Sequence, residues 1–227
     1  MNIYIPEEYF KNSSIGNYNS TNAPIFFPNT VGGYMPGKAD TVGLGRDGKA
    51  NSLSYALSKG YVVAAPGGRT LKDKNGNYTG KAPAAIVDLK AAVKYLYFND
   101  EIMPGDANKI ISNGTSAGGA LSALLGATGN SEDYLPYLTE LGAADTRDDI
   151  FAVSAYCPIT NLENADSAYE WMYNGVNSYT RMEITRNTSS QEYNDRSLTH
   201  STVQGTLTED EIRISNRLEK YVPFLFK

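Results

Sequence analysis

The order of the apolar segments limits the fold of this chain more than any other feature. Short apolar runs, each followed closely by Pro, Gly or Asn, alternate with helical patterns over the first 160 residues. The apolar runs are 2–5, 23–27, 61–65, 109–112 and 151–156, and the helical patterns are 51–58, 84–97 and 117–127. Runs that are apolar throughout are typical of strands covered on both faces. The alternation therefore predicts an α/β fold, a mostly parallel sheet with helices on both faces.

The composition of the chain changes near residue 160. Residues 165–173 and 209–221 have helical patterns, whereas 174–208 is rich in Ser, Thr, Asn and Tyr and has no run that predicts a strand. We therefore expect two parts: 1–160 as a partial α/β core, and 161–227 as part of a lid or insertion.

Length, charge and cysteine content exclude several classes of function. The chain has 227 residues, enough for one buried core, and its formal net charge of −5 argues against a nucleic-acid partner. No segment approaches the ~20 apolar residues that span a bilayer, and the first residues do not resemble a signal peptide. We expect no membrane partner and a cytoplasmic location. The single cysteine, Cys157, excludes an internal disulfide, and no cluster of metal ligands is evident, so we expect no metal and no cofactor.

One segment indicates a catalytic function. Residues 114–118 read Gly-Thr-Ser-Ala-Gly and match the pattern G-x-S-x-G. They follow a predicted strand and open a helix of small residues, which is the context of a nucleophile elbow. In such a turn the serine backbone is strained, and glycines two residues away remove Cβ atoms that would collide. We predict that Ser116 is the catalytic nucleophile; the alternative is a glycine-rich turn with a solvent-facing serine.

An acyl-transfer site also needs two N–H groups that stabilise the oxyanion. The first candidate is the N–H of Ala117, directly after the nucleophile. The second is expected from the loop after an earlier strand, where Gly32 and Gly33 follow the run 23–27. We predict Gly32 as this donor, and Gly33 or a plain turn remain the alternatives.

The base and the acid of a catalytic triad are not evident in the sequence. A serine nucleophile needs an imidazole and a carboxylate that orients it. The only histidine is His200, which lies in the polar segment with no predicted strand ahead of it, so we interpret it as a surface or lid residue. The carboxylates near the last predicted strand are Asp145, Asp148, Asp149 and Asp166. Nothing in the sequence selects one of them.

Three segments resemble bacterial tannases and the related feruloyl-esterase-like hydrolases of the α/β-hydrolase superfamily. They are PNTVGGYMPG (28–37), NGTSAGGALSALLGATGNS (113–131) and SAYCPITNLENADSAYEWMYNG (154–175). The resemblance implies a serine carboxylic-ester hydrolase that cleaves small phenolic, galloyl-type esters through an acyl-enzyme. It maps the nucleophile onto Ser116 and the oxyanion donors onto Ala117 and Gly32.

The chain also departs from the pattern of this family. Members of this family are about twice as long, and their acid and histidine follow the lid, so this chain corresponds to their N-terminal half. The alternatives are a catalytically inactive fragment or scaffold, and a general esterase or acyl-peptidase. In such an N-terminal half, the strand at 151–156 would lack the later strands with which it pairs in this fold. We expect its open edge to favour self-association.

Overall fold

The computed structural model describes residues 1–33, 37–45, 47–69, 80–161, 163–186 and 198–220. Contacts between Cα atoms divide the chain into two compact units, 1–159 and 160–227, and each is described here by itself. Whether the second unit is part of a lid remains a prediction. None of the helices described is both long and apolar enough to cross a membrane.

The first unit contains a five-stranded sheet in the order β1-β3-β2-β4-β5. Its strands are β1 (Asn2–Tyr4), β2 (Pro24–Pro28), β3 (Val62–Ala65), β4 (Asp106–Thr115) and β5 (Ala152–Tyr156). The last four strands are parallel to one another, whereas β1 runs antiparallel to β3. The predicted mostly parallel sheet is confirmed, and the antiparallel direction of β1 is an addition that the sequence did not indicate.

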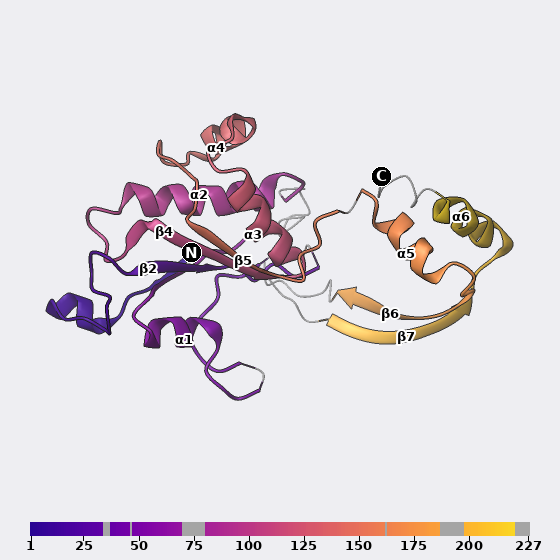
Figure 1. The fold of residues 1–227 in the computed structure, drawn as a ribbon, viewed down its shortest axis with the longest axis horizontal. Helices are drawn as coiled ribbons and strands as arrows, with labels where there is room; N and C mark the ends of the chain where they lie inside the picture. The colour runs from indigo at the N-terminus through magenta and orange to yellow at the C-terminus, as the bar shows by residue number, and fades with distance from the viewer. Residues whose placement is uncertain (34–36, 46, 70–79, 162, 187–197, 221–227) are drawn as a thin grey trace. The chain divides into compact units, whose positions relative to one another are not determined.

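Helices cover both faces of this sheet (Figure 1). Helices α2 (Ala84–Phe98) and α3 (Ala117–Ala127) lie over one face, and α1 (Ser52–Ser58) lies over the other. All three were predicted within one residue at each end. Asn51 caps α1 by accepting a hydrogen bond from the Ser54 amide on its side-chain oxygen.

The residues of β3 show why the strands are apolar throughout. Val62 and Ala64 belong to the larger buried cluster, which contains the inner faces of α2 and α3. Val63 and Ala65 belong to a second cluster with Leu53 of α1. Successive side chains of a strand point to opposite faces, so a sheet covered on both sides buries every residue of β3.

Strand β4 is longer than the predicted run 109–112. It pairs with β2 on one side and with β5 on the other, from Asp106 to Thr115. Hydrogen bonds to neighbours extend the strand into polar residues that hydrophobicity does not mark. Three short elements were not predicted either: the 3₁₀ helices η1 (Glu7–Lys11) and η2 (Glu132–Tyr134) and the helix α4 (Leu135–Leu141).

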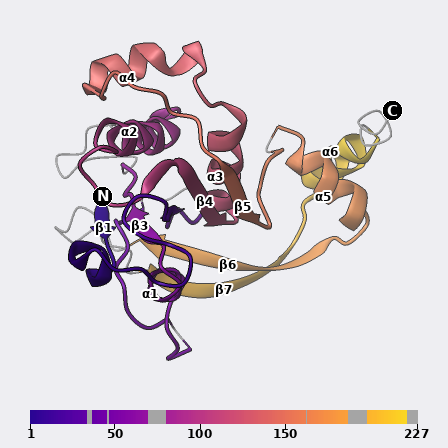
Figure 2. The same ribbon diagram turned by 60° about the vertical axis from the view of Figure 1, so that its left-hand side comes forward.

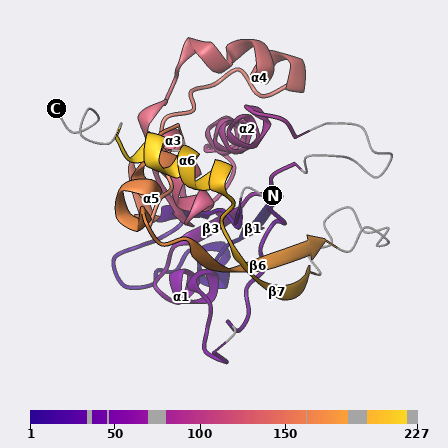
Figure 3. The same cartoon turned by 90° about the vertical axis from the view of Figure 1, so that its right-hand side faces the viewer.

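The second unit contains a helix pair and a two-stranded antiparallel sheet (Figure 3). Its elements are α5 (Ala165–Tyr173), β6 (Ser178–Arg186), β7 (Leu198–Thr206) and α6 (Glu209–Glu219). The helices contact through polar groups, with Ser215 donating to the Glu170 carboxylate and Asn174 donating to Ser215. The prediction that 174–208 holds no strand was wrong. These strands pair through their backbones, and no run of apolar residues marks them in the sequence.

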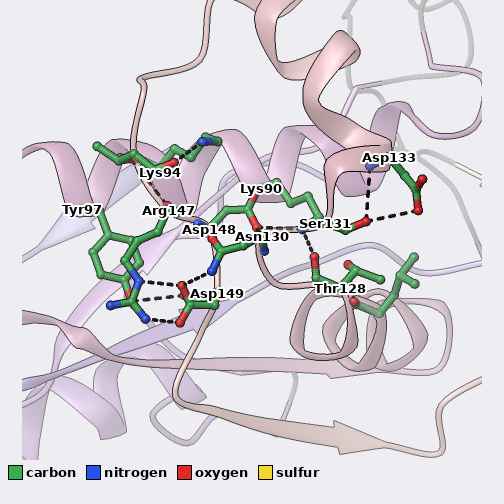
Figure 4. Close-up of polar contacts among 12 residues, drawn as sticks. Lys90, Lys94, Tyr97, Thr128, Asn130, Ser131, Asp133, Arg147, Asp148 and Asp149 are labelled. Carbon is green, nitrogen blue, oxygen red and sulfur yellow. Dashed lines mark hydrogen bonds and ion pairs between the residues drawn. The ribbon is translucent and has the colours of Figure 1, made fainter.

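A buried ion pair joins α2 to the segment before β5 (Figure 4). The Lys90 side chain is fully buried, and its Nζ donates to Asp148 at 2.9 Å and to the Thr128 carbonyl at 2.6 Å. Asp148 also accepts from the Asn130 amide at 2.7 Å. Both charges are therefore paired and hydrogen-bonded, which a buried ion pair requires.

We expect Lys90→Met to lower the free energy of unfolding by ~3–5 kcal/mol, because it leaves the Asp148 carboxylate buried without its positive counter-charge. The measurement is urea denaturation of the 227-residue chain. The matched control is Lys11→Met, since Lys11 pairs with Glu7 on the exposed surface and its loss should change little. Equal shifts for the two variants would contradict the role of the buried pair.

Candidate active site

Ser116 lies at a sharp turn between a strand and a helix, as predicted. Strand β4 ends at Thr115 and α3 begins at Ala117, with β5 alongside (Figure 2). The Ser116 backbone has φ 58° and ψ −120°. A residue with a side chain rarely has positive φ, and such strain concentrates at functional sites. The expected backbone of a nucleophile elbow is therefore present at Ser116.

Hydrogen bonds from the end of β5 hold this turn. The Ser116 amide donates to the Tyr156 carbonyl at 2.9 Å, and the Ser116 carbonyl accepts from the Ile159 amide at 3.3 Å. The Ser116 N–H is thus already hydrogen-bonded to a strand of the sheet. The Ala117 N–H belongs to the first turn of α3, where backbone N–H groups have no acceptor within the helix. This location suits an oxyanion donor.

The two glycines of the motif allow α3 to approach the sheet. A Cβ on Gly114 would lie 2.2 Å from the Gly118 carbonyl oxygen. A Cβ on Gly118 would lie 2.7 Å from the Val31 carbonyl oxygen and 2.7 Å from Asn29 Oδ1. All three distances are shorter than any van der Waals contact, so neither glycine accepts a side chain without movement of the surrounding atoms. The predicted reason for the glycine spacing is confirmed, and Asn29 is an addition to it.

The predicted oxyanion loop begins beside the start of α3. Strand β2 ends at Pro28, and the contact of Val31 with Gly118 places the residue before Gly32 next to the first turn of α3. Gly33 has φ 56°, whereas the φ of Gly32 is not positive. The assignment of the second donor to Gly32 stays a prediction.

The loop after β3 has a structural role. Arg69 donates from its backbone amide and from Nε to the Asp88 carboxylate, at 2.8 Å in each case. The Gly68 amide donates to the Gly37 carbonyl at 2.8 Å. Burial raises the pKa of the Asp88 carboxyl, although the hydrogen bonds and charge of Arg69 act in the opposite direction. These contacts hold Gly68 and Arg69 in a fixed turn.

The structure removes Asp148 and Asp149 as candidates for the triad acid. Both precede β5, whereas Ser116 follows the end of β4, where Thr115 pairs with Tyr156 at the last position of β5. The length of β5 separates them from the serine, roughly 17 Å at ~3.3 Å per residue. Asp148 is bound to Lys90, and hydrogen bonds from Arg147 lower the pKa of Asp149 to about 2 (Figure 4).

His200 lies in a strand, although the sequence predicted no strand in its segment. It is in β7, where it pairs with Ile184 of β6, so the absence of a strand ahead of it was a wrong prediction. The placement of its side chain lies outside what the structure describes. The first unit, residues 1–159, contains no histidine. The interpretation of His200 as a lid residue stays a prediction.

We expect Gly114→Ala to lower the free energy of unfolding by ~1–3 kcal/mol, because its Cβ would meet the backbone of Gly118 and force α3 away from the sheet. Thermal or urea denaturation of the chain measures this effect. Gly68→Ala is the matched control, since its Cβ would lie 3.6 Å from the nearest atom, an ordinary contact. A Gly114→Ala variant as stable as this control would show that α3 is less closely packed than described.

Comparisons with known proteins identify a matching family and similar solved structures. A family model described as BD-FAE matches residues 32–203. A structure titled as Fusobacterium nucleatum tannase is 84% identical with a TM-score of 0.89, over 98% of this chain and 47% of that one. A tannase structure from Lactobacillus plantarum is 47% identical with a TM-score of 0.86, over 98% of this chain and 47% of that one.

A further structure is titled as tannin acyl hydrolase in complex with ethyl gallate. It is 48% identical with a TM-score of 0.81, over 96% of this chain and 44% of that one. No curated protein matches this chain. The chain thus spans about half the length of the solved structures that it matches. The resemblance predicted from three segments and the α/β-hydrolase type of fold are confirmed.

Proposed function

Because the chain belongs to the BD-FAE family, a family of α/β-hydrolase esterases, we propose that it is part of a serine carboxylic-ester hydrolase. We propose small phenolic esters of the galloyl type as its substrates, since the similar structures are titled as tannases and one of them as a complex with ethyl gallate. The single observation that carries the proposal is the backbone of Ser116, with φ 58° between β4 and α3.

The proposed reaction uses Ser116 as nucleophile. A base takes the proton of Ser116 Oγ while the oxygen attacks the ester carbonyl, and the carbonyl oxygen becomes an oxyanion. The N–H groups of Ala117 and Gly32 donate hydrogen bonds to it, and one such donor contributes ~10²–10³ to the rate. The alcohol leaves with a proton from the protonated base. Water then cleaves the acyl-enzyme to release the acid and regenerate Ser116.

We propose that the base and acid of the triad come from sequence outside these 227 residues. The first unit has no histidine, and Asp148 and Asp149 lie at the opposite end of the sheet. The solved relatives are about twice as long, with 53% of the first one not covered by this chain (100 − 47). The parts that this chain supplies are thus the nucleophile and the oxyanion hole.

We also propose that the chain self-associates through the edge of β5. Within the described sheet β5 has a neighbour on one side only, β4. Phe151, just before it, and Tyr156, at its end, are exposed. An unpaired edge with apolar side chains favours pairing with another strand.

We expect the 227-residue chain alone to hydrolyse a galloyl ester weakly, because Ser116 lacks its base. Residual catalysis of ~10³–10⁴ over water is what an oxyanion hole and binding alone supply. The assay follows release of gallate, with and without a polypeptide homologous to the uncovered half of the tannases, and the mixture should be much faster. Full activity of the chain alone that is lost in His200→Ala would make His200 the base and refute the proposed origin of the triad.

We expect Ser116→Ala to reduce hydrolysis by the complemented enzyme at least ~10³-fold, because the nucleophile is lost. Thr115→Ala is the matched control: it removes the neighbouring, exposed hydroxyl and should keep the activity. Equal losses in the two variants would exclude Ser116 as the nucleophile. A comparison of galloyl with acetyl esters tests the substrate class, and equal kcat/KM for the two would favour a general esterase.

A further inference from the structure

Asn29 lies where the loop after β2 meets β4 and α3. Its side chain is 8% exposed. The Nδ2 group donates to the Gly118 carbonyl at 3.0 Å, to Ser122 Oγ at 2.9 Å and to the Asn113 carbonyl at 3.3 Å. One amide thus contacts the strand before Ser116 and the helix after it. No local sequence pattern marks this residue, because its partners lie 84 to 93 positions away along the chain.

The amide of Asn29 occupies the space that the two motif glycines leave. A Cβ on Gly114 would lie 2.8 Å from Asn29 Nδ2, and a Cβ on Gly118 would lie 2.7 Å from Asn29 Oδ1. The glycines of G-x-S-x-G and the side chain of Asn29 therefore form one packing arrangement. Any change in the size of this side chain reaches both ends of the turn that holds Ser116.

The environment of this amide selects a hydrogen-bond donor. All three partners of Nδ2 are oxygen atoms, and two of them are backbone carbonyls that cannot donate. Asn29 Oδ1 is buried without a hydrogen-bond partner among the residues described. An unpaired buried acceptor costs ~1–3 kcal/mol, so this amide is not the most stable choice for folding alone. What this side chain supplies at the turn is the Nδ2 donor.

The backbone of Asn29 adds a second connection. Its amide donates to the Asn113 carbonyl at 2.9 Å, and Asn113 Nδ2 donates in turn to the Ser154 carbonyl of β5 at 3.2 Å. The end of β4 is therefore fixed from both sides. Gly32 follows Asn29 by three residues, so Asn29 connects the start of the loop that carries Gly32 to the helix that begins at Ala117.

We propose that Asn29 is a positioning residue that sets the spacing between the oxyanion donors Ala117 and Gly32 and the Ser116 hydroxyl. The inference rests on the proposed function. The Asn29 side chain bonds to Asn113, Gly118 and Ser122, so in this proposal it acts through the Gly118 carbonyl and the loop that leads to Gly32. A misplacement of ~1 Å at such a site lowers the rate by ~10²-fold.

The first test compares kcat and KM in the complemented enzyme with a galloyl ester. Asn29→Ala should lower kcat by ~10²-fold with little change in KM, because the donors are misaligned in the transition state while substrate binding persists. Ser122→Ala is the matched control: it removes one acceptor of Nδ2 but leaves both backbone carbonyl contacts, and kcat should stay within about twofold. A similar loss of kcat in both variants, or none in Asn29→Ala, overturns the proposal.

Asn29→Asp gives a readout that a purely structural role would not produce. The protonated carboxyl can donate one hydrogen bond to the Gly118 carbonyl, whereas the carboxylate faces two backbone carbonyl oxygens that cannot donate to it and that repel it. Burial raises the pKa of such a carboxyl. The ratio of variant to wild-type kcat should therefore be highest at low pH and fall as pH rises, while the ratio for Asn29→Ala stays flat. Two flat ratios overturn the proposal, provided that circular dichroism shows both variants folded.

A third measurement does not depend on activity. Hydrogen exchange of the amides of 114–119 in the 227-residue chain should speed up in Asn29→Ala more than in Ser122→Ala, with exchange in α1 unchanged. If the wild-type complemented enzyme hydrolyses no ester, or Ser116→Ala has no effect, the proposed function fails and this exchange still tests the geometry. If the wild-type complemented enzyme is active but the amides of 114–119 exchange at equal rates in both variants, only the positioning role of Asn29 is refuted.

Discussion

The close contact of α3 with the ends of β2, β4 and β5 is the constraint on which the candidate site depends. A positive φ at a residue with a side chain costs about 1–3 kcal/mol and persists only where the surroundings hold it. At Ser116 the surroundings are hydrogen bonds to Tyr156 and Ile159, and the backbone of a helix that approaches because Gly114 and Gly118 have no Cβ. Loosening this contact would let the Ser116 backbone relax, and its hydroxyl would lose its fixed direction.

The same contact brings together loops from three strands. Asn29 and Val31 follow β2, Ser116 follows β4, and Ile159 follows β5, all at the carboxyl ends of parallel strands. In open α/β sheets ligands bind at this edge. Asp148, which pairs with the buried Lys90, lies beyond the other end of β5, so this ion pair does not line the site.

Most elements of the first unit could be predicted because local pattern and burial agree there. Strands covered on both faces are apolar throughout, and α2 carries its apolar residues on one stripe. The elements that were not predicted are those in which local pattern and structure do not agree. The polar ends of β4, and the strands β6 and β7, are held by backbone pairing that side-chain hydrophobicity does not report. The direction of β1 depends on its partner β3, which is some sixty residues away.

The sequence by itself determined the turn at Ser116. Its glycine spacing and the small residues after it are local stereochemistry, which depends on neighbours within a few positions. Only the tertiary structure decided which distant groups complete the turn. Asn29 reaches Gly118 across 89 positions and Lys90 reaches Asp148 across 58, and no local pattern marks either pair. A single hydrogen bond between distant residues leaves no periodic trace in a sequence, because its geometry exists only once the sheet has brought the two segments together.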